Sequence, residues 1–181
     1  MLSDMEIIRR VREGRIREFH RLIDRYQGQV FALAFHILGR REEAEDAVQD
    51  TFVSAYQGLH KFIDGSPLWP WLRRIAVNCC LSKLPREFPT DEIGGLVENE
   101  QPFVDSVQSE AIRNHDCRAV TRAVAGLPSQ YRIVVVLRYH DDLTPSEIAD
   151  LLDEPAGTIR VRLHRALKML FERLAVIENE L

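Results

Sequence analysis

The sequence predicts an all-α protein in which an acidic, flexible linker joins two small helical domains. Apolar residues recur at intervals of three and four in long segments on both sides of the chain's middle, which is typical of amphipathic helices. The middle segment, PREFPTDEIGGLVENEQPFVDSVQ, is acidic, rich in proline and has no sustained period. The apolar run IVVVL has no visible partner strand and lies between helical patterns, so we interpret it as a buried helix.

We divide the 181 residues into a first domain at 1–85, a linker at 86–112 and a second domain at 113–181. The net charge of −4 arises in the linker. The first domain carries 13 basic and 11 acidic residues, the linker 1 and 7, and the second domain 10 and 10. The acidic average therefore does not exclude binding of nucleic acid by either domain.

Several protein classes are excluded by what the sequence lacks. Cys79, Cys80 and Cys117 are an odd number without CxxC spacing, which argues against a disulfide framework or a zinc site. No GxxxxGK[ST], GxSxG or HExxH motif occurs, so we expect neither an enzyme nor a cofactor. The start, MLSDMEIIRRVREG, is too charged for a signal peptide, and no apolar run spans a bilayer. We expect a cytoplasmic protein without direct membrane insertion.

The first domain shows three successive helical patterns. The segment FHRLIDRYQGQVFALAFHIL has one broad apolar face and stops at Gly39. The segment REEAEDAVQDTFVSAYQGLHKF follows, with acidic residues in its first turns, where they suit the positive end of the helix dipole. After the loop IDGSP, an aromatic-rich helix is expected from about residue 68 to 84, with Pro70 tolerated in its first turn.

Both tryptophans flank that loop. Trp69 and Trp71 open the third helix, and Arg74 and Asn78 follow closely. Aromatic faces, amides and guanidinium groups beside an open loop can stack on and hydrogen-bond unpaired bases. Packing of the tryptophans in the core is an equally good interpretation, because Trp71 falls near the apolar face.

The second domain ends in a predicted helix-turn-helix. Helices are expected from about residue 111 to 125 and again after GLPSQ. Thr144 and Pro145 then mark a helix start, with Glu147 placed for a capping box, and DEPAG separates this short helix from a second one that starts near Gly157. A short helix, a tight turn and a longer basic helix form this DNA-binding motif.

The last helix has two different sides at about 100° per residue. Its apolar stripe contains Ile159, Leu163, Ala166, Leu167 and Leu170. The outward residues are Val161, His164, Arg165 and Lys168, with Arg160 and Arg162 at the two shoulders. Four basic residues and no acidic one lie between Gly157 and Phe171. Such a helix can enter a major groove, where arginine pairs with guanine and the flanking cations reach phosphates.

Four segments, taken in order, resemble one protein family. They are AEDAVQDTFVSAYQGLHKF, WLRRIAVN, LPSQYRIVVVLRYHDDLTPSEIADLL and EPAGTIRVRLHRA. The chain resembles the extracytoplasmic-function sigma factors of bacterial RNA polymerase from about Glu18 to Leu174. The resemblance implies a transcription initiation factor with sigma region 2 at 1–85 and sigma region 4 at 113–181. It also implies core RNA polymerase, promoter DNA as duplex and melted strand, and an anti-sigma factor as partners.

The resemblance further implies roles for single residues. Glu45, Asp46, Gln49 and Asp50 would dock on the clamp helices of the polymerase. A flipped base of the minus-ten element would be bound by the 62–66 loop with Phe62, Asp64 and Ser66, and the path of the opened strand would be lined or flanked by Trp71, Arg74 and Asn78. The minus-thirty-five element would be read by Arg160, Val161, His164, Arg165 and Lys168.

Two departures from the family pattern stand out. Where the family carries a basic run that holds duplex phosphates, this chain reads CCLSKLPREFP and keeps only Lys83 and Arg86. Val161 replaces a residue that is commonly small and polar, and it offers only apolar contact, for example to a thymine methyl group. Two alternatives remain at this point: a stand-alone operator-binding regulator, and an adaptor that binds proteins through its acidic linker.

Overall fold

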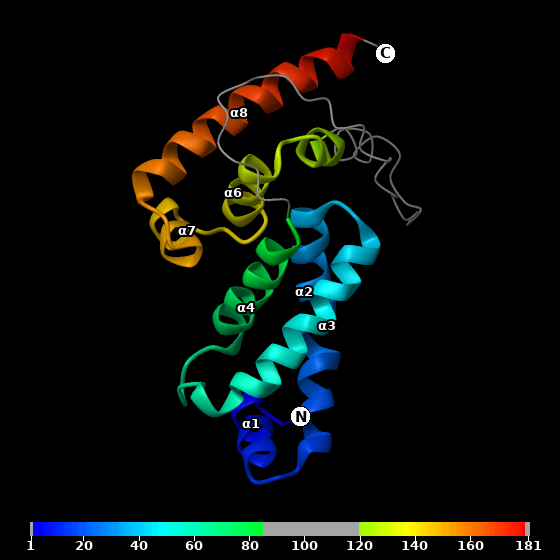
Figure 1. Cartoon of the computed structure of the whole chain (residues 1–181), viewed down its shortest axis with the longest axis vertical. Coiled ribbons are helices and arrows are strands. Elements are labelled where there is room, and N and C mark those ends of the chain that lie inside the picture. The colour runs from blue at the N-terminus through cyan, green and yellow to red at the C-terminus, as the bar shows by residue number, and fades with distance from the viewer. Residues whose placement is uncertain (1, 85–119, 180–181) are drawn as a thin grey trace. The chain divides into compact units, whose positions relative to one another are not determined.

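The computed structural model describes residues 2–84 and 120–179 and divides the chain into two compact units, Met1–Leu84 (unit 1) and Pro85–Leu181 (unit 2). Every regular element in these two ranges is a helix, and no strand occurs there (Figure 1). The predicted fold class, two small all-helical domains, is confirmed. The linker predicted at 86–112 lies outside the described residues.

Unit 1 begins with a helix that the sequence analysis did not assign, α1 (Asp4–Arg12). Its N-cap, Ser3, accepts a hydrogen bond from the backbone N–H of Glu6, and the Glu6 carboxylate accepts one from the Ser3 N–H in return. Ile7 and Ile8 are completely buried. The short 3-10 helix η1 (Ile16–Phe19) then leads into the second helix.

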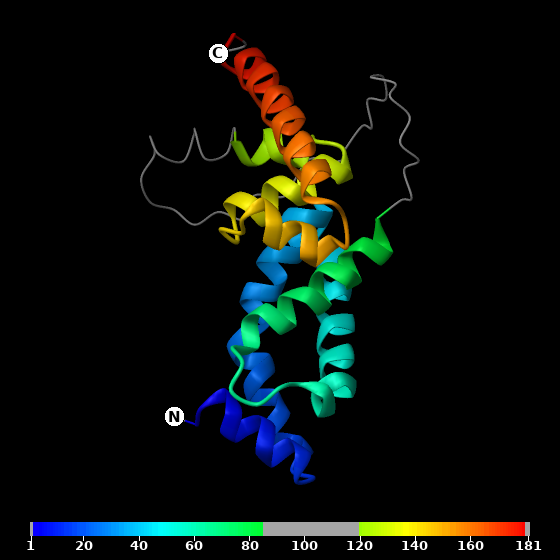
Figure 2. The ribbon, with the colours of Figure 1, turned by 90° about the vertical axis from the view of Figure 1, so that its left-hand side faces the viewer.

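Three longer helices form the core of unit 1, namely α2 (His20–Leu38), α3 (Arg41–Gly58) and α4 (Leu68–Lys83). All three pack on one another, as the two perpendicular views show (Figures 1 and 2). Gly39 ends α2 in the left-handed conformation, with φ of 78°, as the sequence predicted. Ala44, Ala47 and Ala55 are fully buried, and these small side chains let α3 approach its neighbours closely.

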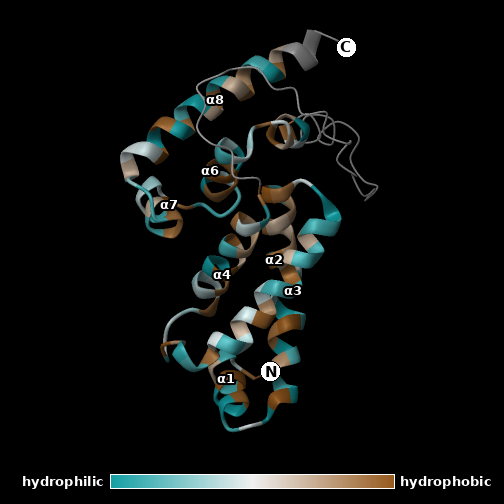
Figure 3. Ribbon diagram, in the orientation of Figure 1, coloured by the Kyte–Doolittle hydropathy of each residue, from teal (hydrophilic) through white to brown (hydrophobic). Residues whose placement is uncertain are grey.

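Unit 2 contains a helical segment at 120–125, then α6 (Ser129–Tyr139), α7 (Pro145–Leu152) and α8 (Ala156–Asn179). The run IVVVL lies in α6, and its residues are buried, which confirms the prediction of a buried helix. Both α6 and α7 pack on α8. Hydrophobic and hydrophilic residues occur together on these helices (Figure 3), as expected for elements with one buried side.

None of the helices in the described ranges is both long and apolar enough to cross a membrane.

Candidate nucleic-acid interface

The helix-turn-helix of unit 2 is held by contacts between residues close in sequence. Thr144 caps α7: its hydroxyl accepts from the Glu147 N–H at 3.3 Å, and the Glu147 carboxylate accepts from the Thr144 N–H at 2.8 Å. Asp153 ends α7 in the left-handed conformation, with φ of 56°. Glu154 in the turn pairs with Arg162 of α8 at 2.8 Å. The cap thus stabilises the start of α7, and the Glu154–Arg162 pair joins the turn to α8.

The two sides of α8 differ as the sequence predicted. Ile159 and Ala166 are completely buried, and Leu163 is buried as well. Five residues on the other side are exposed and form what we call the recognition face: Arg160, Val161, His164, Arg165 and Lys168. Val161, at 51% exposure, is an apolar position among cations. The recognition face can therefore offer hydrogen-bond donors and one apolar contact to a groove.

In unit 1, the short helix η2 (Leu59–Lys61) leads into the 62–66 loop, whose tip is exposed and whose base is buried. Phe62 is only 5% exposed and packs edge-to-face on Trp71, with ring centroids 5.2 Å apart. Ile63 is 74% exposed, and Asp64 and Ser66 are exposed beside it. The loop thus presents Ile63, Asp64 and Ser66 to solvent, with the Phe62–Trp71 pair at its base.

One face of α4 continues from this loop. Trp71, Arg74 and Asn78 follow at helical spacing, with Trp71 half-buried and the other two exposed. Arg74 and Asn78 supply hydrogen-bond donors along the face, and Trp71 connects it to Phe62 in the loop. The structure therefore places the predicted minus-ten residues on the loop and on one face of α4, which are joined by the contact between Phe62 and Trp71.

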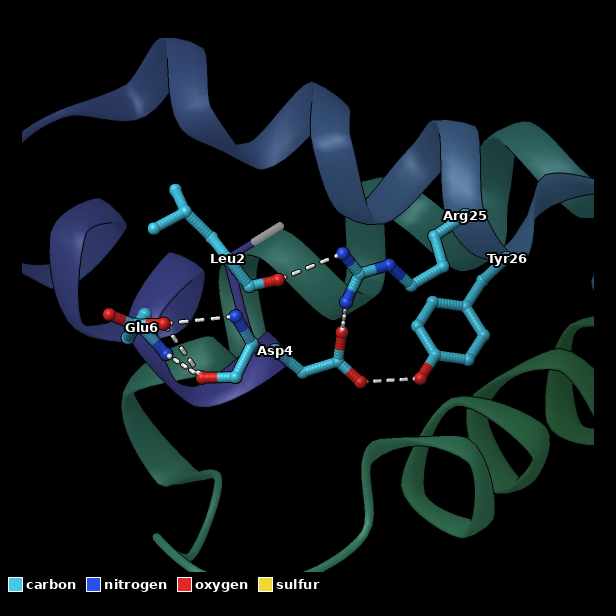
Figure 4. Close-up of polar contacts among 6 residues, drawn as sticks. Leu2, Asp4, Glu6, Arg25 and Tyr26 are labelled. Carbon is cyan, nitrogen blue, oxygen red and sulfur yellow. Dashed lines mark hydrogen bonds and ion pairs between the residues drawn. The ribbon is translucent and has the colours of Figure 1, made fainter.

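Trp69 has a packing role. Its ring stacks on Tyr26 with centroids 6.4 Å apart, and the Tyr26 hydroxyl donates to Asp4 at the start of α1. Arg25 donates to the same carboxylate and, at 3.0 Å, to the carbonyl of Leu2 (Figure 4). Burial and the bond to Asp4 raise the pKa of Tyr26 to about 12. This network fastens the start of α1 to α2.

Four exposed residues form the acidic face of α3: Glu45, Asp46, Gln49 and Asp50. Two of the carboxylates are paired inside unit 1, Glu45 with Arg41 at 2.8 Å and Asp50 with Lys83 at 2.8 Å. The hydrogen bond to Asp50 raises the pKa of Lys83. Lys83, which the sequence analysis kept as a phosphate ligand, is thus directed to α3, and its companion Arg86 lies outside the described residues.

The cysteines of unit 1 fit a packing role. Cys80 is completely buried, and burial raises its pKa to about 12, so it carries a neutral thiol at physiological pH. Cys79 is half-buried. Cys117 lies outside the described residues. Within the described ranges, no group of three metal-ligating side chains occurs.

One residue beside the loop was missed by the sequence analysis. Arg12, the last residue of α1, donates hydrogen bonds to the carbonyl of Leu59 and pairs with Asp64 of the loop. A signal for α1 exists in the sequence, because Ser3 and Glu6 have capping-box spacing before an apolar run. No local pattern joins Arg12 to a loop about fifty positions later.

Comparison with known families defines the class to which these two units belong. Residues 22–87 match the family described as Sigma-70 region 2, and residues 117–170 match Sigma-70, region 4. The first match covers the helices around the 62–66 loop, and the second covers the helix-turn-helix. The chain is therefore a sigma factor with regions 2 and 4.

Comparison with individual relatives shows which group of sigma factors the chain belongs to. The chain is 30% identical over 176 residues to the ECF RNA polymerase sigma factor SigW of Bacillus subtilis, covering 92% of this chain and 94% of that protein. It is 32% identical over 178 residues to the ECF RNA polymerase sigma-E factor of Escherichia coli, covering 91% of each chain. The chain belongs to the extracytoplasmic-function (ECF) sigma factors. These are transcription initiation factors and not enzymes.

Solved structures have the same fold. The sigma factor RpoE of Bartonella quintana, in complex with the anti-sigma factor NepR, aligns with a TM-score of 0.63 and 23% identity, covering 88% of this chain and 98% of that chain. CnrH, in complex with the cytosolic domain of CnrY, aligns with a TM-score of 0.60 and 25% identity, covering 96% and 97%.

Proposed function

We propose that the protein works in the cytoplasm with core RNA polymerase and uses three separate surfaces to start transcription at particular promoters. The acidic face of α3 docks on the polymerase clamp helices. The 62–66 loop and the face with Trp71, Arg74 and Asn78 hold a base flipped out of the minus-ten element. The recognition face of α8 reads the minus-thirty-five duplex.

The recognition face is the observation that carries this proposal. Its cations are exposed on a helix whose other side is buried, and the capped α7 and the Glu154–Arg162 pair support that helix. Arginine and lysine on such a helix suit guanine edges and phosphates in a major groove. The apolar Val161 suits a thymine methyl group.

The surface of unit 1 suits a melted strand better than a duplex. Asp64 and Ser66 offer exposed polar groups to a single base, Ile63 offers an apolar contact beside them, and Phe62 packs on Trp71 at the base of the loop. Stacking on proteins contributes about 1–3 kcal/mol per base, which is enough to help hold a few unpaired bases. Arg74 and Asn78 then provide donors for the neighbouring sugar and phosphate groups.

We also propose an anti-sigma factor as a partner. RpoE of Bartonella quintana is described with an anti-sigma factor, and CnrH with the cytosolic domain of CnrY. The acidic face of α3 is a candidate surface for such an inhibitor, because a protein that covers it competes with polymerase directly.

Run-off transcription from genomic DNA with purified core polymerase tests the proposal. Added protein should produce new transcripts with defined starts. Asp50→Ala combined with Gln49→Ala should lower polymerase affinity, while Asp24→Ala, a matched exposed carboxylate on α2, should not. Tight, sequence-specific operator binding without polymerase would instead favour a stand-alone regulator. Full function after replacement of both Arg160 and Arg165 would favour an adaptor.

A further inference from the structure

Arg12 contacts the backbone at the base of the 62–66 loop from a distant part of the chain. Its Nε donates to the Leu59 carbonyl at 3.2 Å, and one terminal nitrogen donates to the same oxygen at 2.9 Å. That nitrogen also donates to the carbonyl of Phe62, and the other one pairs with Asp64 at 2.6 Å. One guanidinium thus joins α1 to three residues of η2 and the loop.

The carbonyl groups around Arg12 favour a positively charged side chain. Leu59 and Phe62 lie where α3 and η2 end, and the last carbonyls of a helix lack intrahelical donors and carry partial negative charge. A cation from another element can satisfy these carbonyls. Arginine does so better than lysine, because its planar fork directs several N–H groups to separate acceptors, whereas lysine is a point charge.

The remaining restraints on the loop leave its tip dependent on this contact. Phe62 is anchored beneath the loop by Trp71, and the Ser66 N–H donates to the Ile63 carbonyl at 3.2 Å. Asp64, 68% exposed, has Arg12 as its ion-pair partner. The pair holds the carboxylate to one side and offsets a negative charge that would otherwise repel the phosphates of an approaching strand.

We propose that Arg12 is a positioning residue for minus-ten recognition. It sets the shape of the 62–66 loop and neutralises Asp64 before DNA arrives, without touching a base itself. The inference rests on the proposed function of the loop. It makes α1, which lies before the matched Sigma-70 region 2 at 22–87, a part of the promoter-reading machinery.

The attachment of α1 does not depend on Arg12. Ile7 and Ile8 are completely buried, and Asp4 is held by Arg25 and Tyr26 at the other end of the helix. Removing the Arg12 side chain should therefore loosen the loop and leave α1 packed on unit 1. This separation allows a positioning role to be distinguished from a general contribution to stability.

The test uses the full-length chain with Arg12→Ala, Arg12→Lys and a control, Arg10→Ala. Arg10 lies on the same helix and pairs with Glu18 at 3.9 Å, away from the loop. Hydrogen exchange of the amides at 62–66 reports loop order without DNA. The binding probe is a single-stranded oligonucleotide with the non-template minus-ten sequence of a promoter mapped by run-off transcription, added to holoenzyme.

We expect Arg12→Ala to speed exchange in the loop and to weaken oligonucleotide binding about tenfold, the size that follows from losing a charged hydrogen-bond donor to the Phe62 carbonyl and to Asp64, while the Leu59 carbonyl keeps its bond from the Phe62 N–H. Affinity for core polymerase should stay within about twofold, because the substitution changes the loop and not the acidic face of α3. Arg12→Lys should recover part of the binding, and Arg10→Ala should behave as wild type. Asp64→Asn should make the loss from Arg12→Ala smaller, because the charge to be neutralised is gone.

Two outcomes overturn the inference while the proposed function stands. One is oligonucleotide binding by Arg12→Ala equal to that of Arg10→Ala. The other is equal loss of oligonucleotide and polymerase binding together with a lowered melting temperature, which would make Arg12 a general stabiliser. If the wild-type holoenzyme itself starts no promoter-specific transcript, the proposed function of the loop fails first.

Discussion

The two candidate DNA surfaces are built in opposite ways. In the helix-turn-helix, Thr144 bonds Glu147 three positions away, and Glu154 pairs with Arg162 eight positions away. The 62–66 loop is held by Arg12, which lies 47 to 52 positions from its acceptors. The polar contacts that hold the helix-turn-helix thus come from its own segment, although α8 also packs on α6, whereas the polar contacts of the loop include a residue from the start of unit 1.

Because of this difference, the two surfaces should tolerate different substitutions elsewhere in the chain. A surface held by neighbouring residues survives changes elsewhere in the chain, as long as its helix is capped and its apolar stripe is packed. A surface held by distant residues fails when any supporting element moves. The comparison can be tested by perturbing each kind of support in turn.

The largest effect is expected from the core beneath α1. Ile8→Ala removes a completely buried side chain and should lower the free energy of unfolding of unit 1 by about 2–5 kcal/mol. Trp69 and Trp71 both lie in unit 1, so the tryptophan fluorescence transition in urea measures this loss directly. Hydrogen exchange in α7 should stay unchanged. If amide hydrogen exchange became slower in the 62–66 loop, or faster in α7, the contrast between the two surfaces would be wrong.

The next effect concerns base reading in unit 2. Arg160→Ala and Arg165→Ala should each weaken promoter binding by about 1–3 kcal/mol, and the loss should disappear when the contacted base pair is changed. Arg122→Ala, an exposed arginine on another helix of unit 2, is the charge-matched control. Footprinting of holoenzyme on minus-thirty-five variants provides the measurement. Equal losses of promoter affinity on every minus-thirty-five variant would show that these arginines contact phosphates and not bases.

A smaller effect is expected at the N-cap of α7. Thr144→Ala removes the hydroxyl that accepts from Glu147 and should destabilise α7 by about 1 kcal/mol. Thr144→Ser keeps the acceptor and should restore the helix. Amide exchange in α7 measures the loss, and exchange in the 62–66 loop should not respond. A response there would mean that the two surfaces are not independently held.

The effect that is smallest near neutral pH is a dependence of the stability of unit 1 on pH. The pKa values of Tyr26 and Cys80 are both raised to about 12 from reference values of 10.0 and 9.0, in both cases mainly by burial. Above pH 9 the unfolded chain loses these protons first, so the stability from the protonated groups, complete below pH 9, declines toward pH 12. Tyr26→Phe should flatten the upper part of this decline in urea titrations. An unaltered slope would exclude Tyr26 as a source.

The same comparison explains how much the sequence alone could predict. The stripe of Ile159, Leu163 and Ala166, the cap at Thr144 and the helical nature of IVVVL were all predicted correctly. The first two depend on periodicity or on residues three apart, and the third was predicted from the helical patterns on either side. Placement of DNA-binding roles on the recognition face stays a prediction.

Contacts between distant segments were not predictable in this way. Lys83, at the end of α4, was assigned to phosphates from the family pattern, and its ion-pair partner Asp50 lies on α3, 33 positions earlier. Phe62 was placed in a base pocket by resemblance, and its burial against Trp71 depends on how α4 packs. The role of Arg12 needs both α1 and the loop in three dimensions.

The Lys83–Asp50 pair has a consequence for how the protein responds to salt. If polymerase docks on Asp50 as proposed, a cation of the partner replaces Lys83 as the counter-charge, and a partly exposed pair of this kind is worth at most about 1 kcal/mol. Little charge is newly neutralised in that exchange. In the proposed promoter complex, the recognition face instead brings cations to phosphates and displaces bound ions from the duplex. Promoter DNA should therefore dissociate from the holoenzyme at a lower salt concentration than the one that separates this protein from core polymerase.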